Sequence, residues 1–424
     1  MDLIIEGRAF YRGKLQPVCI GIDEGKIVAV KKVLAGENRL DFKDRLVLPG
    51  AIDVHVHFRD PGNTQKEDFG TGTLAAAYGG VTTVFDMPNT NPPTVMAEDI
   101  VNKREMASGK SWVDFGLFGG VDARHDPTKM DPHAVGYKIF MGSSTGSLLV
   151  TKDTDIVNAL AKISSTGKVI SVHAEDDGYI VRSPEKDLHD HNRNRPPYAE
   201  VSAIARLANL HGPARINVCH VTSRDAMAAL EGTGFTKEAT VHHMLLDDSM
   251  PLGGRGKVNP PLRTKEDRLA ILDAFVKGKI DMLASDHAPH GQDEKSGDFD
   301  AAPSGVPGVE TSVPMMMALV KRGLVPLERL VSAACQRPAE VFGLSKGMIE
   351  VGRDADLMVV DPKNVTQIKS KHLHSKCGWT PYEGYEAIFP TAVFLRGMEL
   401  VESSSLVGER KGRDVVVAGR SGRP

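Results

Sequence analysis

Residues 53–62 read Asp-Val-His-Val-His-Phe-Arg-Asp-Pro-Gly and close an apolar run that begins at residue 46. His55 and His57 alternate with valines, so in a β-strand both imidazoles point to the same side. Two imidazoles two residues apart can chelate one divalent cation, and zinc favours this ligand type. The stretch therefore predicts a buried strand that ends in a metal site.

Seven further apolar, β-branched runs follow this one, and most are separated by segments with helical periodicity. Strands that alternate with helices indicate parallel pairing, and eight of them within about 250 residues are typical of a TIM barrel. The predicted fold is therefore α/β, a (β/α)8 TIM barrel, with a doubly wound open sheet as the structural alternative. The eight predicted strands lie within 46–58, 81–87, 112–121, 134–141, 169–175, 215–222, 239–246 and 281–289.

The two ends of the chain have a different pattern, with short β-like pieces broken by Gly and Asp turns. This pattern covers residues 1–47 and recurs at 347–361 and 388–419. Neither end has enough strands for a stable core alone, so we expect them to pair into one small β-sandwich beside the barrel. The predicted domains are residues 1–47 and 346–424, which form the two parts of the sandwich, and a catalytic barrel at residues 48–345.

Composition excludes several classes of protein. The 424 residues carry a net charge of −3, which argues against a nucleic-acid or anionic-membrane partner. No apolar run approaches the roughly 20 residues that span a bilayer, and the first residues do not resemble a signal peptide. Four widely spaced cysteines argue against a disulfide scaffold or a thiolate zinc site. We therefore expect a cytoplasmic globular protein.

Other metal-ligating or ionisable residues also fall at predicted strand ends. These residues are Lys138, His173, His220 and Asp286. Active sites of TIM barrels lie at the carboxyl ends of the strands, so we expect these side chains to meet His55 and His57 at one mouth. Lys138 stands out because a buried ammonium is costly unless it is neutralised or paired.

The remaining histidine pairs have simpler interpretations. His189 with His191, and His372 with His374, lie in polar stretches and are predicted to be surface histidines. His242 and His243 are adjacent and are predicted to be structural residues within the seventh strand.

Several of these motifs together resemble the cyclic amidohydrolases of the amidohydrolase superfamily, and within it the dihydroorotases. The resemblance covers about residues 45–345, and its most specific parts are DVHVHFRDP and the ASDHAPH that precedes Lys295. It implies a composite β-sandwich, a (β/α)8 barrel and a binuclear zinc centre. The motifs that carry it are DVHVHFRDPG, DMPNTNPPT, VHAED, VCHVTS, KVNPPLR, SDHAPHGQDEK and PSGVPGVET.

The resemblance also implies a role for each candidate ligand. His55, His57 and Asp286 would bind one zinc ion, and His173 and His220 the other. Lys138 would be carbamylated, and this N6-carboxylysine would bridge the two ions. Some bacterial relatives have an aspartate at the bridging position, whereas the context of Lys138 resembles allantoinases and hydantoinases.

The implied reaction is the reversible hydrolysis of L-dihydroorotate to N-carbamoyl-L-aspartate in de novo pyrimidine (UMP) synthesis. Two zinc ions lower the pKa of a shared water, and the hydroxide attacks the ring amide while Asp286 shuttles the proton. The substrate carboxylate calls for a forked cationic donor, and Arg59 is placed for it. Asn89, Asn259 and His290 resemble the other substrate-binding residues of the family, and the loop 303–308 would approach the ring.

Two alternatives remain open at this point. One is an allantoinase or hydantoinase, and the other is an inactive barrel that serves as a scaffold for aspartate carbamoyltransferase. The resemblance further implies a homo-oligomer, either a dimer or a tetramer, with a possible association with aspartate carbamoyltransferase. The substrate is expected to be a small molecule.

Overall fold

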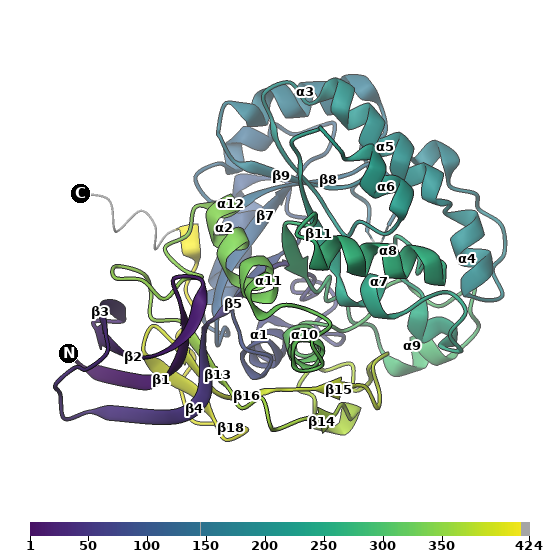
Figure 1. Ribbon diagram of the computed structural model, residues 1–424. Helices are drawn as coiled ribbons and strands as arrows, with labels where there is room; N and C mark the ends of the chain where they lie inside the picture. Colours follow the sequence, from purple (N-terminus) through teal and green to yellow (C-terminus); the bar gives the residue numbers. More distant parts are fainter. Residues whose placement is uncertain (145, 417–424) are drawn as a thin grey trace.

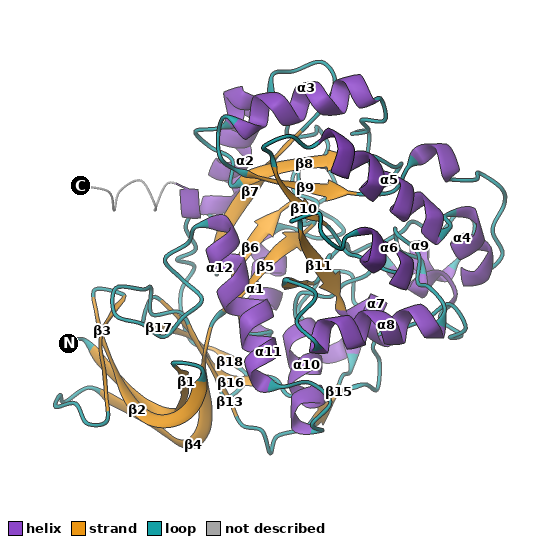
Figure 2. Ribbon diagram, turned by 45° about the horizontal axis from the view of Figure 1, so that its top comes forward, coloured by secondary structure: helices purple, strands orange, loops and turns teal. Residues whose placement is uncertain are grey.

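The computed structural model describes residues 1–144 and 146–416. Its centre is a sheet of eight parallel strands in sequential order, β5 to β12, surrounded by helices (Figures 1 and 2). The strands are β5 (Ala51–Val56), β6 (Val81–Asp86), β7 (Asp114–Gly120), β8 (Gly136–Phe140), β9 (Val169–His173), β10 (Arg215–Val218), β11 (Thr236–Thr240) and β12 (Met282–Ala284).

The sheet closes between its first strand and the segment that follows its last strand. The backbone N–H of His57 donates to the carbonyl of His287 at 2.7 Å, and Val56 forms a parallel bridge with His287. The predicted (β/α)8 TIM barrel is thereby confirmed. Because both sheet faces are covered, β5 to β9 are built almost wholly from buried residues.

Helices form the outer layer, and several begin at a side-chain cap. Asp68 and Thr264 accept hydrogen bonds from backbone N–H groups of the first turns of α1 and α8. The α-helices are α1 (Phe69–Tyr78), α2 (Ala97–Ser108), α3 (Asp153–Ser164), α4 (Leu188–Asn194), α5 (Pro197–Leu210), α6 (Arg224–Ala229), α7 (Val241–Leu245), α8 (Lys265–Val276), α9 (Gln292–Ser296), α10 (Ser312–Lys321), α11 (Leu327–Val331) and α12 (Arg337–Phe342).

Two of the predicted strands differ from the structure. The run 46–58 is divided at Gly50, which packs so tightly that an added Cβ would lie 2.3 Å from the Thr82 hydroxyl. The seventh strand was predicted too late in the chain. It ends at Thr240, whose side chain caps α7, so His242 and His243 lie in a helix and not in a strand.

The two ends of the chain share one eight-stranded, strongly curved sheet beside the barrel (Figure 2). Its two halves meet where β13 pairs antiparallel with β4. The strand order is β18 (Ser405–Leu406), β17 (Met398–Glu402), β16 (Pro390–Leu395), β13 (Leu357–Val360), β4 (Arg39–Pro49), β1 (Leu3–Tyr11), β2 (Lys14–Asp23) and β3 (Lys26–Lys31). The curved sheet encloses an apolar core of its own, which includes residues of both termini.

Parts of the C-terminal region return to the barrel. The segment that includes β14 (Thr366–Gln367) and β15 (Glu386–Ala387) packs beside α10, where the Ile388 N–H donates to the Pro314 carbonyl. Farther on, the Phe115 N–H in β7 donates to the Arg413 carbonyl. Residues 417–419, the end of the predicted β-like stretch, lie outside the described residues.

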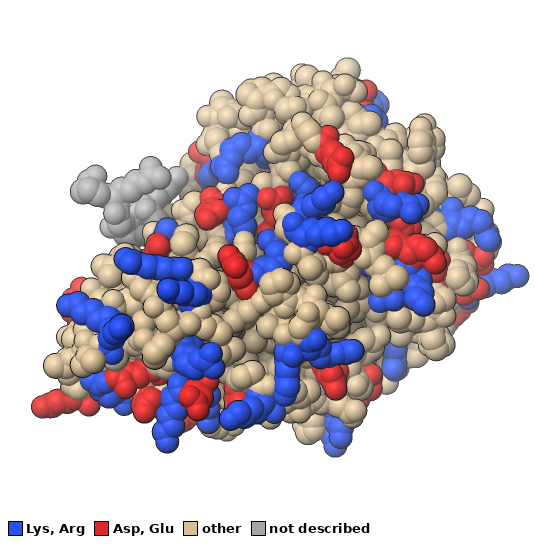
Figure 3. Space-filling view, in the orientation of Figure 1, with Lys and Arg blue, Asp and Glu red and all other residues tan. Residues whose placement is uncertain are grey.

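The distribution of charged side chains on the surface and the polarity of the helices agree with the nearly balanced charge of the sequence. On the face shown in Figure 3, Lys and Arg side chains are interspersed with Asp and Glu. Within the described residues, no helix combines the length and the apolar character that a membrane span requires.

A buried ion-pair network joins the barrel to the curved sheet. The Lys346 ammonium lies 2.7 Å from Asp114 in β7, 2.6 Å from Asp356 just before β13, and 3.0 Å from Asp354. Arg396 also pairs with Asp114. Removal of the central cation would leave three carboxylates close together in a buried place, which is strongly unfavourable.

We therefore expect Lys346→Met to lower the free energy of unfolding by about 3–5 kcal/mol in urea titrations. Lys26→Met is the matched control, because Lys26 also pairs with Asp354 but its side chain is 47% exposed. The control should cost less than about 1 kcal/mol. Equal effects of the two substitutions would contradict a special role for Lys346.

Candidate metal centre and substrate pocket

A pocket of about 350 Å³ opens at the carboxyl ends of the barrel strands. All the residues predicted for the site line it except His290. The lining comprises His55, His57, Arg59, Asn89, Lys138, Phe140, Ser144, His173, His220, Asn259, Asp286, Ala288, Ser304 and Gly305.

Three of the predicted ligands converge on one point. The Nε2 atoms of His55 and His57 lie 3.4 and 3.1 Å from Asp286 Oδ1. Zinc–ligand bonds of about 2.0–2.1 Å in a tetrahedron place neighbouring ligand atoms about 3.3 Å apart. The three side chains therefore have the spacing of a metal site, although β5 and the segment after β12 are more than 200 residues apart in sequence.

A second pair of imidazoles lies beside this group. Nδ1 of His173 and Nε2 of His220 face each other at 3.0 Å, and the His55 and His220 rings are 5.4 Å apart between centroids. Lys138 in β8 is fully buried, and its ammonium donates to the Cys219 sulfur at 2.9 Å. No carboxylate of the described residues lies within ion-pairing distance of Lys138.

The outward nitrogens of three candidate ligands are held by polar partners. His57 Nδ1 lies 2.7 Å from the Asn89 side-chain oxygen, and His173 Nε2 lies 2.7 Å from Glu175. Such partners fix the orientation of metal-binding imidazoles. Glu175 is itself paired with the buried Arg195.

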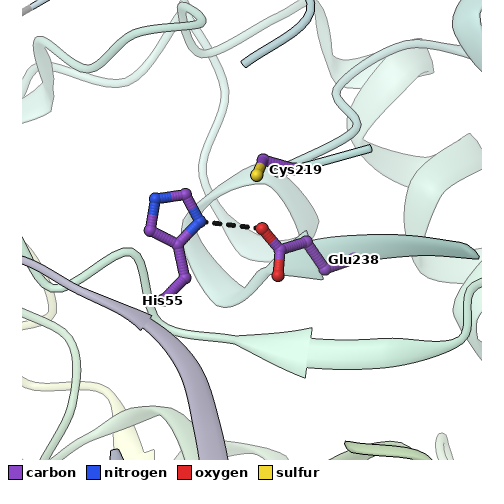
Figure 4. A group of neighbouring side chains, drawn as sticks. All are labelled: His55, Cys219 and Glu238. Atoms are coloured by element: carbon purple, nitrogen blue, oxygen red, sulfur yellow. Dashed lines mark hydrogen bonds and ion pairs between the residues drawn. The ribbon is translucent and has the colours of Figure 1, made fainter. Parts of the chain in front are cut away.

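The third of these contacts is made by Glu238. Its carboxylate lies 2.7 Å from His55 Nδ1, with Cys219 next to the pair (Figure 4). Sequence reasoning missed Glu238 because the strand that carries it was placed too late in the chain. The sequence Thr-Lys-Glu-Ala-Thr of this strand has no polar–apolar alternation that could have revealed it.

Burial and the local charges set the ionisation of the site. Burial lowers the pKa of His57 to about 3 and that of His220 well below its ordinary value. Burial acts to raise the pKa of Asp286, but His55 and His57 hold it well below its usual range. His57 and His220 are therefore neutral and the Asp286 carboxylate is ionised at neutral pH, which is the state that binds a cation.

Three site residues also adopt an unusual backbone conformation. Arg59, His220 and Asp286 have φ angles of 60°, 36° and 45°, and they are the only described non-glycine residues of the barrel with positive φ. A non-glycine residue with a positive φ angle destabilises the fold, and such residues cluster at functional sites. The turns after β5, β10 and β12 thus aim these side chains into the pocket.

The predicted substrate-binding residues occupy two layers. Arg59 is 6% exposed and lines the pocket, whereas His290 is 2% exposed and lies behind it, with Nε2 3.1 Å from the guanidinium. His290 also contacts Lys66 and the Ser304 carbonyl. Asn259 lines the pocket and its side-chain oxygen accepts from the Ser304 hydroxyl at 3.1 Å.

The burial of His191 differs from the prediction. His191, predicted to be a surface residue, is 3% exposed and its Nε2 lies 3.0 Å from the Asn259 side-chain oxygen. Its other ring nitrogen, Nδ1, lies 2.9 Å from the carboxylate of Glu185, six residues earlier in the chain. The side chain of His189 is 61% exposed, as predicted.

The donor set fits a metal centre. Five imidazole and carboxylate side chains are gathered in one pocket, and His55, His57 and Asp286 place their ligand atoms within 4.8 Å of one another. In addition, His220 Nδ1 is buried without a hydrogen-bond partner among the described residues. That ring is therefore oriented by packing, with Nε2 toward His173.

Comparisons with known proteins identify the family of the chain. The chain is 40% identical to the dihydroorotase of Methanosarcina mazei over 97% of its length and 96% of the relative. It is 38% identical to the dihydroorotase of Thermoplasma acidophilum, with 95% of each chain covered. Among solved structures, the L-hydantoinase of Arthrobacter aurescens matches with a TM-score of 0.92 and 29% identity, over 98% of this chain and 99% of that one. The family model "Amidohydrolase family" matches residues 46–392, and the chain belongs to the amidohydrolase family.

Proposed function

We propose that this protein is a dihydroorotase, which interconverts L-dihydroorotate and N-carbamoyl-L-aspartate by opening and closing a cyclic amide. The archaeal relatives that match nearly the whole chain support this function. The structural observation that carries it is Arg59, a buried guanidinium that lines the pocket next to the candidate metal ligands.

Arg59 is available for an anion. Its guanidinium donates to the Pro289 carbonyl at 3.3 Å and contacts His290 at 3.1 Å, and no carboxylate of the described residues lies within 4 Å of it. Burial lowers its pKa to about 10, so it remains charged at neutral pH. A charged, forked donor without an anionic partner suits the carboxylate of dihydroorotate, which hydantoin lacks.

The metal centre that we propose holds two zinc ions. His55, His57 and Asp286 would hold one ion, and His173 and His220 the other. Lys138, whose buried amine donates to the Cys219 sulfur and lies 5.1 Å from the centroid of the Phe140 ring, would provide the bridging carboxylate after carbamylation. When bound, the ions would polarise the amide carbonyl and make a water molecule nucleophilic near neutral pH.

The residues of the chain then supply orientation and proton transfer. Arg59 binds the substrate carboxylate, which fixes the ring in the pocket beside Asp286. The Asp286 carboxylate takes a proton from the attacking water as the carbon–oxygen bond forms. It returns that proton to the ring nitrogen as the carbon–nitrogen bond breaks, so the carboxylate ends the cycle ionised.

A second candidate function is that of a hydantoinase-type enzyme. It is favoured by the TM-score of 0.92 to an L-hydantoinase and by the lysine at the bridging position. Parallel assays of the purified protein with dihydroorotate, hydantoin and allantoin decide between the two. Turnover of hydantoin or allantoin without turnover of dihydroorotate would refute the proposal.

The homo-oligomer and the association with aspartate carbamoyltransferase stay predictions from the resemblance, and the cytoplasmic location stays a prediction from the composition.

Arg59→Met should reduce kcat/KM for dihydroorotate by about 100-fold, because the substrate carboxylate loses a charged partner worth about 3 kcal/mol. Zinc content should be unchanged. Arg224→Met, which removes an exposed arginine, is the control and should behave like the wild type. Near-normal kcat/KM in Arg59→Met would remove the basis for carboxylate recognition.

Asp286→Asn keeps the shape of the side chain but cannot accept a proton. We expect kcat to fall at least about 100-fold, the usual contribution of a positioned general base. Zinc analysis of the same preparation separates lost proton transfer from lost metal. Asp293→Asn, on the exposed surface of α9, is the control. Wild-type turnover in Asp286→Asn would assign the proton to another group.

Lys138→Ala should lower the zinc content from two ions per chain to at most one, with loss of most activity. An unmodified ammonium between two cations would repel both, whereas a carbamate attracts them. Added short carboxylic acids should restore part of the metal and the activity. The exposed Lys152→Ala serves as the control. Two zinc ions and normal turnover in Lys138→Ala would disprove the bridge.

A further inference from the structure

Two buried lysines lie side by side behind one wall of the pocket. Lys257 is 6% exposed and Lys295 is 1% exposed. The wall is formed by two segments of the chain, residues 257–259 and 303–305, which contribute Asn259, Ser304 and Gly305 to the pocket lining.

The Lys295 ammonium donates to one backbone carbonyl in each of these segments. It lies 3.0 Å from the carbonyl of Lys257 and 2.7 Å from the carbonyl of Pro303. The carbonyl of Lys257 also accepts from the Gly305 N–H at 2.9 Å. Lys295 therefore joins the two segments at the point where they already touch.

Lys257 reinforces the same junction from the other side. Its ammonium donates to the carbonyls of Phe299 and Asp300 and pairs with Glu185 at 2.9 Å. The difference between the two lysines is the counter-charge. Lys257 has a carboxylate partner, whereas no carboxylate of the described residues lies within ion-pairing distance of Lys295.

A lysine in the position of Lys295 is costly for stability. Burial, followed by the charges of Lys257 and Arg59, lowers its pKa to about 7. A buried apolar side chain would avoid this cost, so stability alone does not account for an amine here. The surroundings offer it two carbonyls and the ring of Trp379, 5.7 Å from the ammonium to the ring centroid.

Trp379 connects this junction to the other side of the pocket. Its indole N–H donates to the carbonyl of His290 at 2.8 Å, and the His290 ring contacts both Arg59 and the Ser304 carbonyl. The helix α9 that carries Lys295 also packs closely on Gly254, where an added Cβ would lie 2.6 Å from the Lys295 carbonyl. There is thus little room for Lys295 to shift relative to the wall.

We propose that Lys295 is a positioning residue for substrate binding, which holds Asn259 and the Ser304–Gly305 backbone at the spacing that the cyclic amide ring requires. This inference rests on the proposed function for the identity of the substrate. The substrate ring would contact the wall both in the bound complex and during the reaction. A looser wall should therefore weaken substrate binding more than it slows the chemical step.

The test is Lys295→Met in the zinc-loaded protein, which keeps most of the side-chain volume and removes the donors. We expect KM for dihydroorotate to rise at least about 10-fold, kcat to stay within about 3-fold, and the zinc content to be unchanged. Hydrogen–deuterium exchange of backbone amides in residues 303–308 should become at least about 10-fold faster without substrate, since exchange reports local opening.

Lys346→Met is the matched control, because it removes another buried lysine that is not part of this wall and that pairs with Asp114 at the start of β7. It should lower global stability without a change in KM or in the exchange of residues 303–308 at temperatures where it is folded. If Lys295→Met does not fold, Lys295→Gln, which retains N–H donors on a shorter side chain, is measured in the same way.

An unchanged KM, or exchange of residues 303–308 no faster than in the wild type, overturns the positioning role. Failure of the proposed function is a separate result: the wild type would not turn over dihydroorotate. The exchange measurement needs no substrate and still tests the contact between Lys295 and the wall.

Discussion

The closure of the barrel between β5 and the segment after β12 is the constraint on which the site depends. The hydrogen bond from the His57 N–H to the His287 carbonyl spans 230 residues of sequence. It lies next to His55 and His57 at the end of β5, and to Asp286 in the segment after β12. Asp53 strengthens the same seam by accepting from the Ser285 N–H at 3.1 Å. If the sheet stayed open, Asp286 would be at the opposite edge from His55 and His57. Closure of the barrel thus brings its first and last strands together, and the candidate metal site lies at that junction.

Much of the site could be predicted from the position of its residues at the ends of the predicted strands. Side chains at the carboxyl ends of parallel strands must share one mouth, so His55, His173, His220 and Asp286 could be placed together without coordinates. The same rule failed where its strand was misplaced. Val241–Leu245 is apolar enough to be taken for a strand, but the Thr240 side chain caps a helix there, and Glu238 in the true strand was missed.

Other features have no local signature in the sequence. His191 lies in a polar stretch, and only the folded chain shows that Glu185 and Asn259 satisfy both its nitrogens. The Lys295 ammonium donates to backbone carbonyls, and every residue has a backbone carbonyl, so the sequence gives no sign of these partners. The pairing of the two chain ends was easier to predict, since strands at both ends of a chain that are too few for separate cores must pair with each other.

The chain is similar to hydantoinases in its fold and to dihydroorotases in its sequence. In the function that we propose, the barrel, the candidate ligand group and a carbamylated Lys138 would serve the opening of a cyclic amide, whichever ring carries it. Recognition of one ring over another depends on groups around that centre, and a family fold shared by several enzymes cannot specify it. Arg59 is such a group: its positive φ and its contact with His290 hold a charge at the pocket lining with no anion of the described chain beside it. A buried charge left unpaired is unfavourable in the free enzyme and is relieved by a ligand that carries a carboxylate. The same charge penalises a neutral ring, which would cover the guanidinium without pairing it, so selectivity arises from the cost of the wrong substrate as well as from the attraction of the right one.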